Sequence, residues 1–517
     1  MLAAGDARGA IETVLGALSD TLTDQTQKIG GGLSEQVNPD QLALMLAQVP
    51  VEERAPAEDE LPGTSEPPVE GTERSVEQTT PTGPRKVTPH GRRKLPESLP
   101  REVQVSVVPP AERCCEHCGE ERHVIGYEVS ETLELVPAHF KVIEHRREKL
   151  ACPCCRRGIC VAGPAPGFKV ADRCLAGPGL LTHVSVSKFF YHVPLNRTSG
   201  LYWRLGVRIG TNTLCDWIDL VAYELRPIVE LMWELRLSAH LVQTDATGLK
   251  VLDREEPNGT RLGTMWGYIF DQRIAVFRYT RTGEGETGPW LHLAGRRGYL
   301  LADAANVFDR LYNGLVANAI EVGCNAHCRR RFFKLLDVEP AAAVAIDFYR
   351  KLYHIESEAK KQGLDEQALL HLRRTQSAPI LASFKRWLES MKNKRPPKSA
   401  FAGACRYALN HWTALTRCLE DARLPLDNNL MELQLRSLVV GRKNWLFAGN
   451  DKGAERAAVL LSIMRTCALN GVDPMTYVRD VLVKLADGWP ASRLAELLPD
   501  RWAAAQKPEQ KTKSDAA

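Results

Sequence analysis

The chain has 517 residues, of which 44% are hydrophobic and 25% charged, which is typical of a globular protein of roughly two to four domains. Its net charge of +4 does not by itself indicate a nucleic-acid-binding protein, and no apolar run of about 18 residues predicts a membrane helix. The N-terminus lacks the basic start of a signal peptide. These features predict a cytosolic protein.

The amino-acid composition changes twice within the first hundred residues. Residues 1–50 are predicted to form a short helical region, and residues 51–101 a disordered linker. Within this linker, residues 51–80 hold nine acidic residues and two arginines, whereas residues 81–101 hold six Lys or Arg and one Glu among prolines. A flexible basic arm could contact nucleic-acid phosphates or act only as a solubilising spacer, and the sequence leaves both interpretations open.

Seven of the 14 cysteines fall within residues 114–160, which favours a metal site over disulfides in an intracellular chain. Two motifs, "CEHC" and "CPCC", are separated by 33 residues that alternate like strands over 131–137 and 141–150. Four thiolates at this spacing suit one tetrahedral, structural Zn²⁺ ion. We predict a ribbon-like zinc-binding domain over residues 102–168 with the ligands Cys115, Cys118, Cys152 and Cys155. Four other residues could replace a ligand, namely Cys114, His145, Cys154 and Cys160, and the alternative is a β-hairpin packed with free thiols.

Residues 169–236 are predicted to be helical, with breaks at Gly206 and Gly210. The stretch "SGLYWRLGVRIGTNTLCDWIDLVA" has the pattern of a helix, a four-residue turn and a second helix capped by threonine. This is the rhythm of a helix-turn-helix, although plain helical bundles share it. We predict a helix-turn-helix-like, DNA-binding region.

Two aspartates accompany the strands predicted further along the chain. Apolar and β-branched runs predict strands over residues 238–253, 265–271, 274–283 and 299–303, and a helix over 307–315. Three antiparallel strands, a crossover helix and a fourth strand give the order of an RNase H-like mixed α/β core. In that fold the first and fourth strands are neighbours, so we expect Asp245 and Asp303 to lie side by side. Two carboxylates at such a short distance repel each other unless a cation such as Mg²⁺ or Mn²⁺ neutralises them. Enzymes of two-metal phosphoryl transfer use acid clusters of this kind.

A third acid, Glu432, lies in a predicted helix with an apolar background. Asp427 resembles an N-cap, and the helix is expected to run to Val440 and stop at Gly441. Arg436 lies one turn after Glu432, so it could orient a metal-binding carboxylate or simply pair with it on the surface. From these residues alone, both interpretations stay open.

Basic residues cluster near the ends of these elements. "CNAHC" could hold a second metal, but its ligands are cramped, and we favour His327 as a group that contacts the scissile phosphate or water. Trp445 could stack on a base or belong to the core. Backbone phosphates are the expected partners of the nearby cations Arg330, Arg331, Arg442 and Lys443, and Arg436 is also predicted to bind DNA.

Over residues 95–500 the chain resembles the transposases of the insertion-sequence-66 family, which are DDE-type enzymes with an RNase H-like catalytic core. The blocks that carry the resemblance include "GCNAHCRRRFF", "RYALNHWTALTRCLEDARLPLDNN" and "GRKNWLFAGNDKGAERAAVLLSIMRTCALNGVDP". It implies a catalytic domain over residues 237–485 with a helical insertion at about 334–423, followed by a C-terminal segment and disordered tail at 486–517. It also implies that two Mg²⁺ ions are held by Asp245, Asp303 and Glu432.

The resemblance implies a transposase that binds the ends of an insertion sequence, hydrolyses the DNA strand there and transfers it to target DNA. A homodimer or higher oligomer, small accessory proteins of the same element and action on the bacterial nucleoid within the cytoplasm are also implied. The alternatives are a catalytically impaired or domesticated DNA-binding relative and a plain metal-dependent nuclease. Three positions depart from the residues usual in similar proteins, namely Ala246, Asn325 and Leu433.

Overall fold

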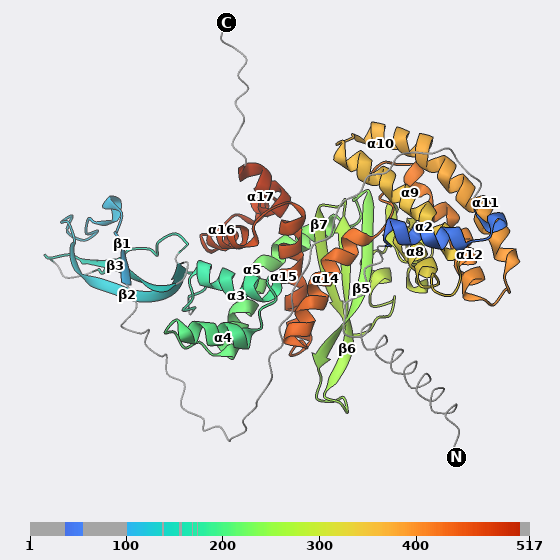
Figure 1. Cartoon of the computed structure of the whole chain (residues 1–517). Helices are drawn as coiled ribbons and strands as arrows, with labels where there is room; N and C mark the ends of the chain where they lie inside the picture. The colour runs from blue at the N-terminus through green and yellow to red at the C-terminus, as the bar shows by residue number, and fades with distance from the viewer. Residues whose placement is uncertain are drawn as a thin grey trace, which may run out of the picture. The chain divides into compact units, whose positions relative to one another are not determined.

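The computed structural model describes residues 37–54, 101–136, 139–154, 158–167, 169–172 and 174–506. The chain divides into two compact units, one with residues 37–54 and 323–427, the other with the described residues of 101–322 and 428–506 (Figure 1). Our predictions for residues 1–36, for most of the linker (55–100) and for the tail (507–517) lie outside the described residues. Among the residues that the structure describes, no helix combines the length and apolar character of a membrane span.

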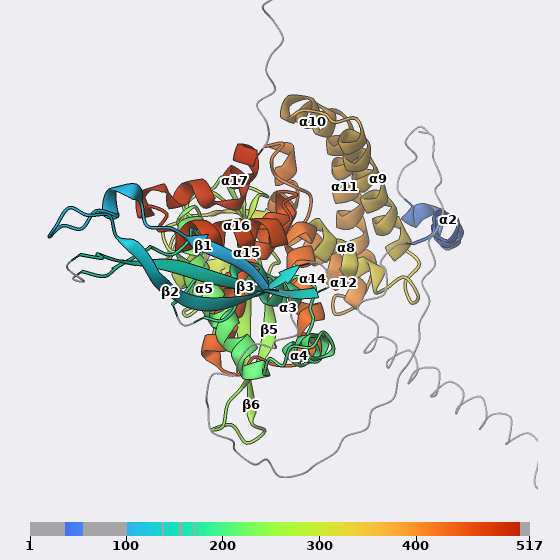
Figure 2. The same ribbon diagram turned by 90° about the vertical axis from the view of Figure 1, so that its left-hand side faces the viewer.

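The cysteine-rich region forms a small sheet with the strand order β1-β3-β2, in which β4 also pairs with β3 (Figure 2). β2 and β3 form a long antiparallel hairpin, and β1 lies parallel to β3. Both predicted strands are therefore confirmed in place, but the first begins much earlier than its predicted start at residue 131. The strands are β1 (Arg101–Ser106), β2 (His123–Val136), β3 (His139–Ala151) and β4 (Cys160–Val161).

Three helices follow the ribbon, and the break expected at Gly206 is confirmed by its left-handed φ of 87°. The predicted threonine cap is wrong, because Thr211 is already the first helical residue and Gly210 occupies the N-cap. A glycine is tolerated there at little cost. The helices are α3 (Pro178–Phe189), α4 (Leu195–Arg204) and α5 (Thr211–Glu234).

The central sheet has the order β7-β6-β5-β8-β9, which confirms that the first and fourth predicted strands are neighbours. β5, β6 and β7 form an antiparallel meander, and β8 lies parallel to β5. The helix predicted over 307–315 is shorter, because the chain turns at Gly314 with φ 82°. The elements are β5 (Leu241–Leu252), β6 (Thr260–Phe270), β7 (Ile274–Thr280), α6 (Pro289–His292), β8 (Tyr299–Ala302), η3 (Asn306–Phe308), α7 (Asp309–Tyr312) and β9 (Ile320–Gly323).

Helices cover both faces of this sheet and one of its edges. Gly267 on β6 faces α14, whereas the next residue, Tyr268, contacts Trp233 of α5, so α14 and α5 lie on opposite faces. α15 runs beside β7, where the hydroxyl of Ser462 accepts a 2.8 Å hydrogen bond from the backbone N–H of Phe277. This contact satisfies part of an otherwise unpaired strand edge. The C-terminal elements are α14 (Asn429–Trp445), α15 (Asp451–Leu469), α16 (Pro474–Ala486), η6 (Ala491–Leu497) and α17 (Pro499–Gln506).

α14 corrects the predicted helix ends. Asn428, not Asp427, is the N-cap residue, and the helix continues through Gly441 to Trp445. Gly441 is buried inside the helix, and an added Cβ would lie 2.8 Å from Trp445 Nε1 and 3.3 Å from His192 Nδ1. This glycine therefore permits a close approach and does not end the helix.

The unit with residues 37–54 and 323–427 is helical, as predicted for the insertion at about 334–423, but it is longer than that insertion and also includes the N-terminal α2. The backbone carbonyl of Glu53 accepts a 2.8 Å hydrogen bond from Trp387 Nε1, and the Glu53 carboxylate pairs with both Nη atoms of Arg395 at 2.8 Å. The elements of this unit are α2 (Pro39–Gln48), η1 (Val51–Glu53), α8 (Asn325–Phe333), α9 (Ala342–Lys361), α10 (Glu366–Leu372), the π-helical turn η4 (Arg373–Ser377), α11 (Ala378–Lys394), α12 (Ala400–Asn410), α13 (Trp412–Leu415) and η5 (Arg417–Leu419).

A fully buried arginine, Arg296, joins the starts of β5 and β8. Its Nη atoms donate hydrogen bonds of 2.5 to 3.2 Å to four backbone carbonyls, those of Arg236, Ala239, His240 and Tyr299. Because buried carbonyls need donors, this guanidinium fixes how the two strands begin.

We expect Arg296→Met to lower the free energy of unfolding by about 3 kcal/mol or more, because it removes the donor from several buried acceptors. Urea denaturation followed by tryptophan fluorescence measures the change. The adjacent Arg297 is exposed and provides the matched control, since Arg297→Met should change stability by less than about 0.5 kcal/mol. Similar losses in both variants would contradict this role of Arg296.

Candidate functional site

The pairing between β5 and β8 determines where the predicted acids Asp245 and Asp303 lie relative to each other. An offset of 58 residues relates Leu241 to Tyr299 and Gln243 to Leu301. The same offset relates Asp245 to Asp303, one residue past the end of β8. The observed pairing ends at Gln243 and Leu301, and extending its register by two residues puts Asp303 level with Asp245; both side chains are half-buried. Among the described residues, the ligand atoms of Asp245, Asp303 and Glu432 do not all lie within 4.8 Å of one another.

Asp245 lies on the face of the sheet that α14 covers. It pairs across the strands with Gly267, so the two residues point to the same face. An added Cβ on Gly267 would lie 2.3 Å from Met431 Cε of α14. Glu432 follows Met431 in the first turn of this helix and is half-buried. The structure thus places the third predicted acid on the helix packed over Asp245.

Asn428 fixes the beginning of α14 to β5. The side chain is fully buried, its Nδ2 donates to the carbonyl of Thr244 at 2.8 Å, and its Oδ1 accepts from Gln243 Nε2 at 3.3 Å. The backbone carbonyl of Asn428 accepts from the N–H of Glu432 at 3.1 Å. This positioning residue was not predicted from the sequence, although the paired amides of "DNN" are a recognisable signal.

Arg442 fixes the other end of α14. Its guanidinium donates to Thr247 Oγ1 at 2.9 Å and to the carbonyl of Gly248, and burial lowers its pKa. The structure therefore gives Arg442 a contact within the protein that the sequence did not predict. By contrast, Arg436 and Lys443 are exposed on the same helix, where solvent or a ligand can reach them.

The positions that depart from the family pattern have different surroundings. Leu433 is 52% exposed beside Glu432, so its apolar side chain does not serve the core. Ala246 is half-buried, and its backbone N–H donates to Asp245 Oδ1 at 2.7 Å. Asn325 is buried, and its Nδ2 donates to the carbonyls of Leu415 and Leu426. Asn325 thus stabilises the helical unit.

Three of the predicted DNA-binding residues lie on α8 in the helical unit, namely His327, Arg330 and Arg331. Arg331 is exposed, with its guanidinium carbon 3.9 Å from the centre of the Tyr407 ring. Cys328 of the same helix is buried, and burial raises the pKa of its thiol to about 12.

The thiols of Cys115, Cys118 and Cys152 lie within 4.8 Å of one another. The sulfur atoms of Cys118 and Cys152 are 2.9 Å apart, and a hydrogen bond from the backbone of His117 helps to lower the pKa of Cys115 to about 6. Cys115 is therefore largely a thiolate at neutral pH, the form that binds zinc. The fourth predicted ligand, Cys155, lies outside the described residues.

Within the described part of the ribbon, the residues that could replace a zinc ligand lie outside the three-thiol cluster. Cys160 Sγ lies 3.8 Å from Glu112 Oε2, and His145 is buried with its Nε2 3.5 Å from Thr132 Oγ1. Burial and Lys169 lower the pKa of His145 to about 4. Cys114 and Cys154 are exposed and are not members of the three-thiol cluster.

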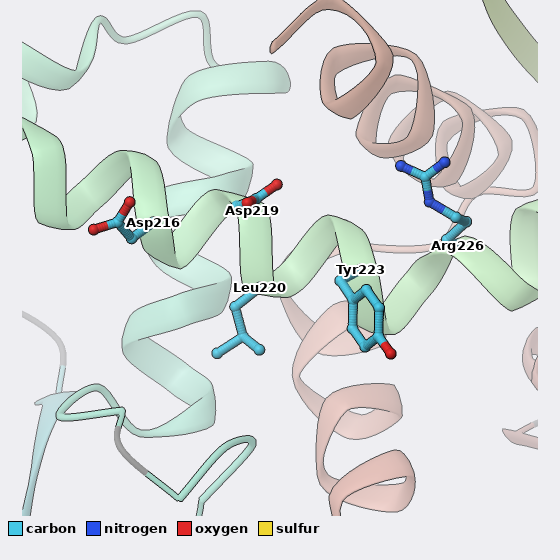
Figure 3. Close-up of a pocket in the computed structure, with 5 residues that line it drawn as sticks. All are labelled: Asp216, Asp219, Leu220, Tyr223 and Arg226. Atoms are coloured by element: carbon cyan, nitrogen blue, oxygen red, sulfur yellow. The ribbon is translucent and has the colours of Figure 1, made fainter. Parts of the chain in front are cut away.

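The middle of α5 is acidic on its exposed side. Figure 3 shows Asp216 and Asp219 on this helix at a pocket that is also lined by Leu220, Tyr223 and Arg226. Carboxylates repel DNA phosphates, so this side of α5 does not suit the DNA backbone. The first turn, 211–213, has exposed uncharged polar side chains, and recognition helices contact bases with this end.

Comparison with known families matches three consecutive parts of the chain. Residues 173–456 match the transposase IS66 family, residues 112–156 the zinc-finger binding domain of transposase IS66, and residues 462–499 the IS66 C-terminal element. The chain belongs to the IS66 transposase family. The zinc-domain match and the three-thiol cluster together support a structural zinc ion. The family suggests transposition and DNA binding.

Relatives of this IS66 family member cover most of its length. It is 34% identical over 433 residues to the uncharacterized protein y4hP of Sinorhizobium fredii, a match that spans 79% of this chain and 76% of the relative. It is 31% identical over 430 residues to the uncharacterized protein y4jD of the same organism, spanning 80% and 82% of the two chains.

We expect metal analysis of the purified chain to find about one zinc ion, and Cys115→Ser to lose it, because the substitution removes a thiolate from the cluster. Cys154→Ser is the matched control, since this exposed thiol lies outside the cluster, and it should keep its zinc. A wild-type protein without zinc, or equal zinc content in both variants, would contradict the assignment.

Proposed function

We propose that this IS66 family member is a DDE transposase with an RNase H-like catalytic core. The sheet order β7-β6-β5-β8-β9, with an antiparallel meander and a parallel fourth strand, supports this core. The observation that supports the proposal is the parallel pairing of β5 with β8, whose register, extended by two residues, puts Asp303 level with Asp245 on the face that the helix of Glu432 covers.

The proposed catalytic residues are Asp245, Asp303 and Glu432. Three carboxylates on rigid elements form an oxygen-only donor set, which suits Mg²⁺ or Mn²⁺ better than softer metals. Two such ions would activate the attacking oxygen and stabilise the leaving oxygen of a phosphodiester. The protein's own contribution is positional, because Asn428 and Arg442 hold both ends of α14 against β5.

DNA contacts are proposed in several parts of the chain. Arg436 and Lys443 are exposed on α14 and suit phosphates of the strand being cut. From the helical unit, His327, Arg330 and Arg331 are proposed as further contacts. The zinc-binding ribbon and the first turn of α5 are proposed to recognise the element ends. Joining two ends in concert favours a homodimer or higher oligomer, and accessory proteins of the element are possible partners.

The proposal is tested with a duplex that carries the element's terminal sequence, in the presence of Mg²⁺. We expect the wild type to cut the strand at the end and to yield products joined to target DNA. Asp245→Asn, Asp303→Asn and Glu432→Gln should each lower cleavage by about 100-fold or more while binding DNA almost as well as the wild type. Glu455→Gln, which changes an exposed acid on α15, is the control and should cut normally.

Each other outcome contradicts a specific part of the proposal. Cleavage that is unchanged in all three acid variants would place the catalytic site elsewhere. A wild type that binds the duplex but never cuts it would be a catalytically impaired relative. Cleavage without joined products would indicate a plain nuclease.

A further inference from the structure

A strongly basic stretch of the helical unit falls on the packed helices α11 and α12 (Figure 1). Residues 385–406 hold seven Lys or Arg and one Glu, so this stretch has a net charge of +6, whereas the whole chain has only +4. Such a concentration of like charge costs free energy through repulsion, and a bound polyanion offsets this cost. The stretch therefore indicates a surface that meets an anionic partner.

The two helices and the loop between them line an open pocket of about 360 Å³, which we call the α11–α12 pocket. This volume falls within the roughly 300–1,000 Å³ of ligand-binding pockets. Three cations and no acid line it. Lys392 is half-buried and Arg406 is exposed, so a ligand from solvent can reach both. The lining residues are Lys392, Asn393, Arg395, Pro397, Arg406, Leu409 and Asn410.

Arg395 holds the α11–α12 pocket in shape. Its Nε donates to Glu339 Oε2 at 2.9 Å, and its Nη atoms pair with the Glu53 carboxylate at 2.8 Å. These hydrogen bonds raise the pKa of the Arg395 guanidinium and compensate its charge. The guanidinium carbon also lies 5.8 Å from the centre of the Phe401 ring of α12. Arg395 is thus a positioning residue that joins the end of α11 to the start of α12.

Lys392 and Arg406 supply the uncompensated charge of the pocket. Within the described part of the chain, neither of them forms an ion pair with a carboxylate. Two like charges on one pocket repel each other, and an anion bound between them relieves the repulsion. Lysine and arginine bind phosphate through charge-assisted hydrogen bonds. The site is separate from the cations of α8, none of which lines it.

The remaining lining residues favour a phosphodiester over a free anion. The side-chain amides of Asn393 and Asn410 can donate hydrogen bonds to phosphate oxygens. Pro397 and Leu409 give the pocket an apolar wall, which the carbon atoms of a sugar can cover and a hydrated anion cannot. We propose that the α11–α12 pocket binds a backbone phosphate of DNA together with the adjoining deoxyribose. This inference rests on the proposed function, because that function supplies the DNA.

The test is a titration of the full, zinc-loaded chain with duplex DNA, without Mg²⁺, Mn²⁺ or a chelator, repeated at several KCl concentrations. We expect the double variant Lys392→Gln and Arg406→Gln to reduce the magnitude of the slope of log K against log salt by about 1, as for one lost phosphate contact. The reduction should be the same for an element-end duplex and for an unrelated duplex, because a backbone contact carries no sequence information. Arg406→Lys retains the charge and should retain the slope.

The matched control is the double variant Arg350→Gln and Lys361→Gln, which removes the same charge from α9 of the same unit. Arg350 pairs with Asp347 at 2.8 Å and Lys361 with Glu358 at 3.0 Å, so both charges are already compensated and the slope should not change. A pocket variant with the slope of the wild type would overturn the inference, even if calorimetry showed that the pocket takes inorganic phosphate. The same reduction in the control would also overturn it, since any loss of charge would then suffice.

The slope is independent of cleavage, because no Mg²⁺ or Mn²⁺ is added, and Asp245→Asn should keep it in full. If the wild type cuts the element-end duplex but the pocket variant keeps the slope, only this inference fails. If the pocket variant reduces the slope but the wild type never cuts DNA, only the catalytic part of the proposed function fails.

Discussion

The buried amide of Asn428 fixes the start of α14, the helix that carries the third proposed acid, because it ties this end of the helix to Gln243 and Thr244 near the start of β5. Its two hydrogen bonds are made inside the protein, where losing a partner is costly. Gly267 lets the helix approach the sheet through Met431, and Arg442 secures the helix further along. Glu432 is therefore held by contacts on either side of it, as a site that must keep its geometry requires.

Much of the core could be predicted from the sequence. Strand patterns are local, so the apolar runs that contain Asp245 and end at Asp303 indicated their strands without a structure. The neighbouring placement of these strands followed from the order of three antiparallel strands, a crossover and a fourth strand. Cysteine spacing likewise indicated four thiol ligands, three of which the structure brings together, while Cys155 lies outside the described residues.

The remaining features depend on contacts between distant parts of the chain, which local patterns do not reveal. Glycine often ends a helix, so the sequence predicted a helix end at Gly441. In the structure, the lack of a side chain at Gly441 instead leaves room for His192, which is distant in sequence. Arg442 was predicted to contact a phosphate because it lies in a basic run, yet its guanidinium donates a hydrogen bond to Thr247 of β5. Arg296, an arginine in a loop, is fully buried because carbonyls from two strand beginnings converge on it.

The central claim is that Asp245, Asp303 and Glu432 form one divalent-metal site. Titration of the full chain with Mn²⁺, followed by electron paramagnetic resonance, tests it without DNA and without catalysis. We expect saturable Mn²⁺ binding by the wild type. Asp245→Asn and Glu432→Gln should each weaken this binding about ten-fold or more, and Glu455→Gln should leave it unchanged. Equal Mn²⁺ binding by the wild type and by both acid variants would contradict it.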